Sequence, residues 1–93
     1  MTEEPLGVVR HYYPRVHAAV VEIQHGTVRE GDTIRIVGHG HDLVEPVRSL
    51  ELDHERVPAA AEGDTVGILI DAAVKENDEV FLLREDEDDM DAG

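Results

Sequence analysis

The sequence predicts an all-β fold, either a small sandwich or a closed barrel. Its 93 residues are enough for one domain with a small core. Val and Ile together outnumber Leu and Met, which favours strands over helices. The apolar residues come in short runs with turn-forming residues between them, which is typical of sandwiches and barrels. The closed barrel is preferred, because so small a sheet would otherwise leave exposed edges.

Six short strands are expected in order along the chain. The first two, "LGVVRHYY" and "VHAAVVEI", are separated by Pro14, and the turn residues His25 and Gly26 end the second. "DTIRIVG" leads into a polar Gly/His loop at 38–42, after which a long run alternates apolar and polar residues. The predicted strands are 6–13, 16–23, 32–38, 44–54, 64–71 and 79–83.

The chain is expected to divide into three parts. An N-terminal arm at 1–5 precedes the β-domain at 6–84, and an acidic tail, "EDEDDMDAG", follows at 85–93. A run of like charges of this kind usually stays disordered and solvated. Within the domain, 56–63 is predicted to be a loop because it holds a Pro and a Gly.

Charge and composition exclude several classes of function. The 22 acidic and 8 basic residues give a net charge of −14, which opposes nucleic-acid binding over the surface as a whole. The absence of Cys excludes disulfides, thiolate metal sites and cysteine nucleophiles. No apolar run is long enough for a membrane span, and the acidic N-terminus does not resemble a secretion signal. A cytoplasmic protein without a cofactor is therefore expected.

The stretch "EGDTI" at 30–34 returns as "EGDTV" at 62–66 and, altered, as "ENDEV" at 76–80. Gly and Asn tolerate positive φ, and an Asp can bond nearby backbone N–H groups, so a repeated turn is predicted. A phosphate-binding loop is excluded, because the chain has no Gly-Lys pair. Catalytic carboxylates on one rim are a weaker alternative. The predicted turn residues are Gly26, Gly31, Asp32, Gly63, Asp64, Gly67, Asn77 and Asp78.

The segment "RHYYPRVH" at 10–17 is the one place in the sequence where cations and aromatic rings alternate. Aromatic rings can stack on bases and Arg can contact phosphates, so this segment is a candidate site for RNA or another partner. The alternative is an ordinary hairpin with one Tyr in the core and solvated cations. The candidate residues are Arg10, His11, Tyr12, Tyr13, Arg15 and His17.

The stretch "HGHD" is a weak candidate for a metal site. His39, His41 and Asp42 lie close enough in sequence for two imidazoles and a carboxylate to share an ion. Further ligands would have to come from elsewhere in the chain, and a flexible exposed loop is the alternative. No metal is therefore assigned.

Three longer segments resemble domain 2 of the translational GTPases, such as elongation factor Tu. They are "HGTVREGDTIRIVG", "VRSLELDHERVPAAAEGDTVGILI" and "VKENDEVFLL". The family's first turn pattern matches Gly26, Val28, Arg29, Gly31, Asp32 and Ile34, and its second matches Ala60, Gly63, Asp64, Val66 and Gly67. The resemblance implies a six-stranded antiparallel Greek-key barrel over 6–84. With "HYY" it extends to short elongation-factor-like proteins and to the barrel that ends some U32-family peptidases.

The same resemblance limits the expected activity. The chain lacks a P-loop and the Asn-Lys-x-Asp motif, so it should not bind GTP. Leu50, Thr65 and Glu51 stand where the family has an aromatic, an Asn and an Arg near the aminoacyl end of tRNA. A non-enzymatic binding module of translation or of an RNA–protein complex is expected. The alternatives are a protein–protein adaptor for an enzyme such as a U32-type peptidase, without RNA contact, and a metal-dependent protein.

Overall fold

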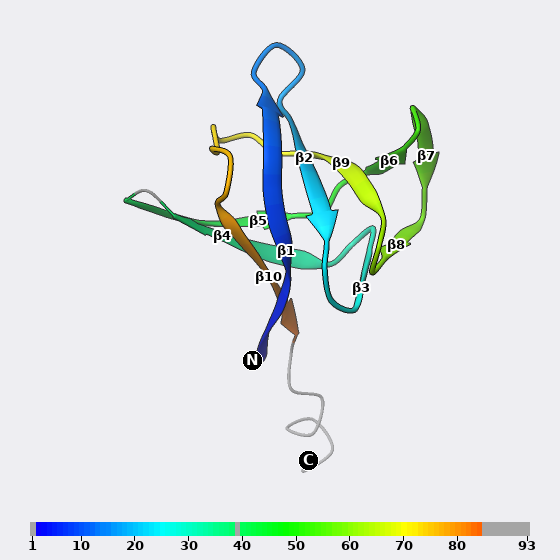
Figure 1. Ribbon diagram of the computed structural model, residues 1–93, viewed down its shortest axis with the longest axis horizontal. Helices are drawn as coiled ribbons and strands as arrows, with labels where there is room; N and C mark the ends of the chain where they lie inside the picture. The colour runs from blue at the N-terminus through cyan, green and yellow to red at the C-terminus, as the bar shows by residue number, and fades with distance from the viewer. Residues whose placement is uncertain (1, 39, 85–93) are drawn as a thin grey trace.

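The computed structural model describes residues 2–38 and 40–84, and these residues form ten β-strands (Figure 1). The strands are β1 (Thr2–Tyr13), β2 (Ala18–Ile23), β3 (Thr27–Arg29), β4 (Thr33–Gly38), β5 (His41–Pro46), β6 (Leu50–Leu52), β7 (Glu55–Val57), β8 (Ala59–Ala61), β9 (Thr65–Leu69) and β10 (Glu79–Arg84). The predicted all-β class is confirmed. Within these two ranges, no helix is long and apolar enough to cross a membrane.

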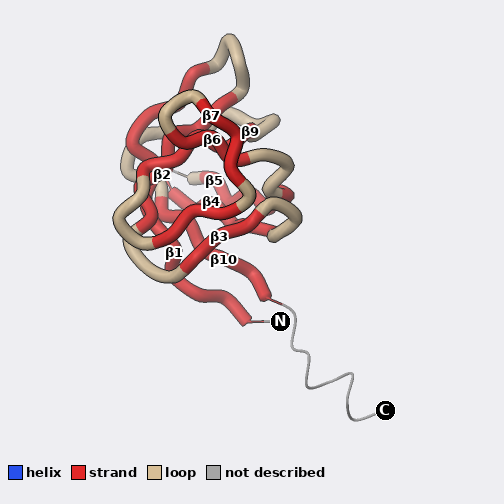
Figure 2. Tube along the Cα trace, turned by 90° about the vertical axis from the view of Figure 1, so that its right-hand side faces the viewer, coloured by secondary structure: helices blue, strands red, loops and turns tan. Residues whose placement is uncertain are grey.

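Eight strands form one sheet and two form another. The larger sheet has the order β5-β4-β10-β1-β2-β9-β6-β7, and the smaller one pairs β3 with β8. Every described pair is antiparallel. Figure 2 shows the strands wound around a common centre. The end strands β5 and β7 do not pair with each other in the described part of the chain, so the hydrogen-bonded order is open rather than the expected closed ring.

The predicted single strand 44–54 is wrong, because the chain changes partners in the middle of it. β5 pairs with β4, whereas β6 pairs with β9. Pro46 ends β5, and it has no N–H with which to continue a ladder. The next residue, Val47, is hydrogen-bonded to the turn at 31–32 instead of to a strand. Its N–H donates to the backbone carbonyl of Asp32 at 2.8 Å, and Gly31 N–H donates to the Val47 carbonyl at 2.9 Å.

The predicted loop 56–63 is also wrong, since it contributes to two short strands. Pro58 lies between β7 and β8 rather than inside either one. β8 consists of three alanines and pairs with β3, where buried Ala60 lies opposite buried Val28. Alanine has a low strand propensity, so the pairing depends on burial and on the partner strand rather than on the local sequence.

The core lies between the strands and consists of aliphatic side chains. One cluster contains Leu6, Val9, Ala19, Val21, Ile23, Val28, Ile34, Ile36, Val47, Leu50, Ala60, Val66, Ile68, Ile70, Val74, Val80 and Leu82. Asp78 is the one buried polar residue among the described positions. Burial in β2 and β4 alternates residue by residue, as expected for strands with one inward face.

β1 is the longest strand and pairs with β10 on one side and β2 on the other. Its register shifts between Pro5 and Gly7 against β10. A Cβ at Gly7 would lie 2.0 Å from the Glu22 carbonyl oxygen, so only glycine fits between these backbones. Residues 2–5, which the sequence suggests as an arm, belong to β1, and Thr2 lies opposite Arg84 of β10. The acidic tail at 85–93 lies outside the described residues.

Candidate docking groove

Three turns share one hydrogen-bonded form, which accounts for the repeated acid–Gly/Asn–Asp stretches. In each turn the Asp Oδ2 accepts a bond from the backbone N–H three residues earlier: Asp32 from Arg29 (2.8 Å), Asp64 from Ala61 (2.9 Å) and Asp78 from Lys75 (2.8 Å). The preceding residue has positive φ: 95° at Gly31, 98° at Gly63 and 75° at Asn77. The Asp side chains therefore accept hydrogen bonds from backbone N–H groups of their own turns.

Asp32 and Asp64 do not lie on a common rim. The Asp32 turn follows β3 and the Asp64 turn follows β8, and these two strands are antiparallel. The two turns consequently lie at opposite ends of the small sheet. This separation removes the geometry that a shared catalytic carboxylate site would need.

Asp78 differs from the other two because it is fully buried. Its Oδ2 also lies 2.6 Å from Nε2 of His41, at the start of β5. A Cβ at Gly38 would lie 2.4 Å from Asp78 Oδ1, so glycine leaves the room that the carboxylate occupies. His41, a predicted metal candidate, is thus in contact with a buried turn carboxylate.

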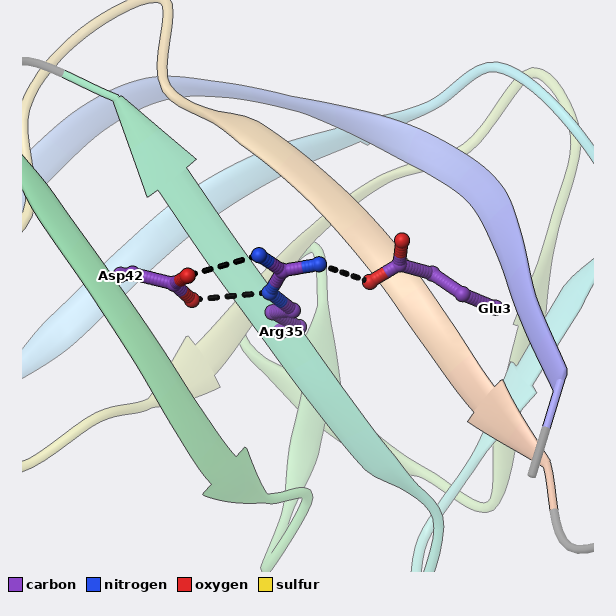
Figure 3. Close-up of polar contacts among 3 residues, drawn as sticks. All are labelled: Glu3, Arg35 and Asp42. Atoms are coloured by element: carbon purple, nitrogen blue, oxygen red, sulfur yellow. Dashed lines mark hydrogen bonds and ion pairs between the residues drawn. The ribbon is translucent and has the colours of Figure 1, made fainter.

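Asp42, another predicted metal candidate, is held by Arg35 (Figure 3). Arg35 donates to both carboxylate oxygens, at 2.8 and 2.6 Å, and it also bonds Glu3 on β1. These hydrogen bonds raise the pKa of Arg35 and lower the pKa of Asp42. His39 lies outside the described residues. Over 2–38 and 40–84, no three His, Asp or Glu side chains are grouped so that they could hold a metal ion.

The structure separates the predicted site residues of 10–17 into different environments. Arg10 on β1 pairs with Glu22 of β2, with its Nε 2.7 Å from Oε1. Tyr12 packs against the core. His17, in the turn, has φ of 54°, and its carbonyl accepts a bond from Ile70 N–H. These three residues therefore have structural contacts.

The other residues of that segment lie on the surface. Tyr13 is 51% exposed, and its ring meets the ring of His11 edge-on with 4.3 Å between centroids. Arg15 is exposed in the turn between β1 and β2, and Val16 beside it is 60% exposed. This hairpin extends beyond the neighbouring strands at the top of Figure 1.

Tyr13 and Val16 border a surface groove over β2, β9 and β6, which we call the β2–β9 groove. It consists of two adjoining depressions that share Val16, Ala18, Glu51 and Gly67. One, of about 230 Å³, is completed by Ser49, Ile68 and Leu69. The other, of about 280 Å³, is completed by Tyr13, Val20, His54 and Thr65. An apolar groove of this kind is suited to binding a partner.

Of the groove residues, the sequence predicted Tyr13 as a site residue and Gly67 as a turn residue, whereas Gly67 lies within β9. The missed signal is in β2, "AAVVEI", whose outward face starts with two apolar residues, Ala18 and Val20, before Glu22. Its inward residues reach the core, whereas Ala18 and Val20 face the groove. Apolar residues on the outward face of a strand at the surface of a small domain predict a second packing partner.

Comparison with known proteins shows similarity to peptidases. No protein-family model matches the chain. The chain is 37% identical over 81 residues to an uncharacterized protease of Methanocaldococcus jannaschii, a match that covers 86% of this chain. It spans only 20% of that relative's length.

Solved structures show the same fold. The C-terminal domain of a Geobacillus thermoleovorans protein described as a U32 peptidase superposes with a TM-score of 0.80 at 17% identity, covering 87% of this chain and 93% of that one. The selenomethionine variant of that domain gives a TM-score of 0.78 at 18% identity, covering 83% and 96%. The chain therefore has the fold of this C-terminal domain.

These findings correct the resemblance to domain 2 of translational GTPases, which is wrong as a guide to the chain's relatives. The expected role in translation or in an RNA–protein complex depended on that resemblance and is wrong with it. The structure supplies the reason: the Gly-Asp patterns satisfy the backbone of turns, so they mark a way of starting a strand rather than a lineage. The likeness to the end of U32 peptidases agrees with the relatives found.

Proposed function

We propose that the chain is a non-catalytic adaptor domain that acts together with a peptidase of the U32 type. The observation that carries this proposal is the 81-residue match, which covers nearly all of this chain but a fifth of the protease-named relative. The shared segment thus corresponds to one part of a larger protein. The shared fold supports the same assignment, because the superposed domain is described as the C-terminal part of a U32 peptidase.

The contacts of the acidic side chains support a binding role rather than catalysis. The three turn aspartates bond backbone N–H groups, and Asp42 bonds Arg35. Acid–base chemistry requires a carboxylate or imidazole that faces a cleft with a reacting partner. The β2–β9 groove offers mainly apolar surface, and its one carboxylate, Glu51, and its one imidazole, His54, are not bonded to each other in the described part of the chain.

We also propose that the fold closes as a barrel through residues 41–52. The first half of this segment pairs with β4 and the second half with β9, so one continuous stretch touches both sides of the sheet. Val47, between the two halves, is buried. NMR contacts between β5 and the opposite end of the sheet, at β6 or β7, would support closure, and their absence would exclude it.

The adaptor proposal is tested by recovery of its partner from the source cells. A tagged chain is expressed at its natural level, purified with its complexes, and each co-purifying protein is quantified against a tag-only control. A U32-type peptidase at close to one copy per adaptor is the expected result. Recovery of no such peptidase above the control would contradict the proposal.

A further inference from the structure

The β2–β9 groove has an order of subsites along β9. Thr65 lines the larger depression, Leu69 lines the smaller one, and Gly67 lines both. These three residues occupy every second position of the strand, so their side chains share one face. Successive members of the three are about 7 Å apart. The groove therefore offers three binding positions in a line along β9: an apolar one at each end and one between them.

Glu51 marks the central position, because it borders both depressions. Its side chain is exposed and forms no hydrogen bond or ion pair within the described part of the chain. Five arginines, by contrast, already have carboxylate partners: Arg10, Arg35, Arg48, Arg56 and Arg84. A carboxylate that is covered by an apolar partner loses hydration, so the partner must supply a cation.

We propose that the groove binds an extended segment of the peptidase partner with the pattern apolar-x-(Lys/Arg)-x-apolar. In an extended chain, side chains two residues apart face the same way, so the two apolar side chains would fill the depressions and the cation would meet Glu51. The net charge of −14 favours a basic segment over an acidic one. This inference rests on the proposed function for the identity of the partner, but the groove's preference can be measured without it.

The test uses the purified full chain and three labelled synthetic peptides, with binding measured by fluorescence polarisation. The probes are Leu-Ser-Lys-Ser-Leu, Leu-Ser-Gln-Ser-Leu and Leu-Ser-Glu-Ser-Leu, each acetylated and amidated. The Lys peptide is expected to bind about fivefold more tightly than the Gln peptide, as for a partly exposed ion pair. Glu51→Gln should remove that preference.

Two variants separate the groove from general charge and stability effects. Glu62→Gln removes one exposed, unpaired carboxylate outside the groove lining and should bind the Lys peptide like the unmodified chain. Gly67→Val adds a side chain on the groove face of β9, where a Cβ would lie 3.9 Å from its nearest neighbour, the Glu51 carbonyl oxygen. This variant should stay folded and weaken binding more than tenfold. Glu51→Lys should reverse the preference and select the Glu peptide.

Several outcomes would overturn the proposal. They are no binding of the Lys peptide by the unmodified chain, equal binding of the Lys and Gln peptides, and unchanged binding by Gly67→Val. Self-association in sedimentation that Gly67→Val abolishes would make a second copy the occupant instead. If the peptide preference holds but no peptidase co-purifies, the proposed function fails alone. If the peptidase co-purifies equally with Gly67→Val, the assigned surface fails alone.

Discussion

The turn at Asp78 and the turns at Asp32 and Asp64 have the same internal hydrogen bond but opposite surroundings. All three carboxylates accept from the backbone N–H three residues earlier. Asp32 and Asp64 remain partly exposed, whereas Asp78 is buried beside His41 and Gly38. The local sequence thus determines the form of the turn, and the strand packed against it determines how much the same carboxylate contributes to stability.

Replacement of the three aspartates should give the largest contrast. Asp78→Ala leaves the His41 ring and the Lys75 backbone N–H, which are both partly buried, without their acceptor and should cost about 3 kcal/mol of unfolding free energy. Asp64→Ala removes one bond at a partly exposed turn and should cost about 1 kcal/mol. Urea denaturation of both variants measures the difference. Equal losses would mean that burial adds nothing to the shared bond.

The neighbouring glycines should show a smaller contrast of the same kind. Gly38→Ala places a Cβ against the Asp78 carboxylate and should cost about 2 kcal/mol through overpacking. Gly63→Ala has open space around it, but its φ of 98° strains any other residue by about 1 kcal/mol. Thermal melts of the two variants, compared at equal concentration, test this order. A larger loss for Gly63→Ala would show that backbone strain exceeds the packing effect.

Asn77 offers a way to make the third turn more like the first two. Its φ of 75° is accessible to Asn but easier for Gly. Asn77→Gly should therefore change the free energy of unfolding by no more than about 0.5 kcal/mol, and we expect an increase rather than a decrease. Gly63→Asn is the matched control and should lose a comparable amount. A large loss for Asn77→Gly would reveal a role for the amide side chain.

Asp42 extends the comparison to a carboxylate held by a cation rather than by a backbone N–H, with the smallest expected effect. Its hydrogen bonds to Arg35 lower its pKa below the usual 3.8. Because the pKa of Asp42 is lower in the folded protein than in the unfolded chain, its ionised carboxylate stabilises the fold above pH ~4. This stabilisation is lost as the pH falls through the folded-state pKa. Asp42→Asn should therefore make unfolding free energy depend less on pH in the acid range. An unchanged acid slope would contradict this linkage.

The sequence was informative where local chemistry decides the structure and misleading where distant partners do. The strand and turn preferences of Gly31, Gly63 and Asn77 could be recognised from residue type. β8 could not, because its alanines become a strand only opposite β3. The break after Pro46 similarly depends on the Asp32 turn, which lies far away in sequence. The β2–β9 groove joins residues from three strands and a hairpin, so only the apolar residues on the outward face of β2 hinted at it.

The pairing of Thr2 with Arg84 has a mechanical consequence. Both ends of the described chain leave from one pole, at the bottom of Figure 1, while the hairpin after Tyr13 lies at the other. Tension applied through the two ends would pull β1 and β10 apart one residue pair at a time, because their hydrogen bonds run across the strands. Such peeling requires much less force than sliding two strands past each other. A domain tethered in this way would yield at its attachment point first, while the groove at the far side kept its shape.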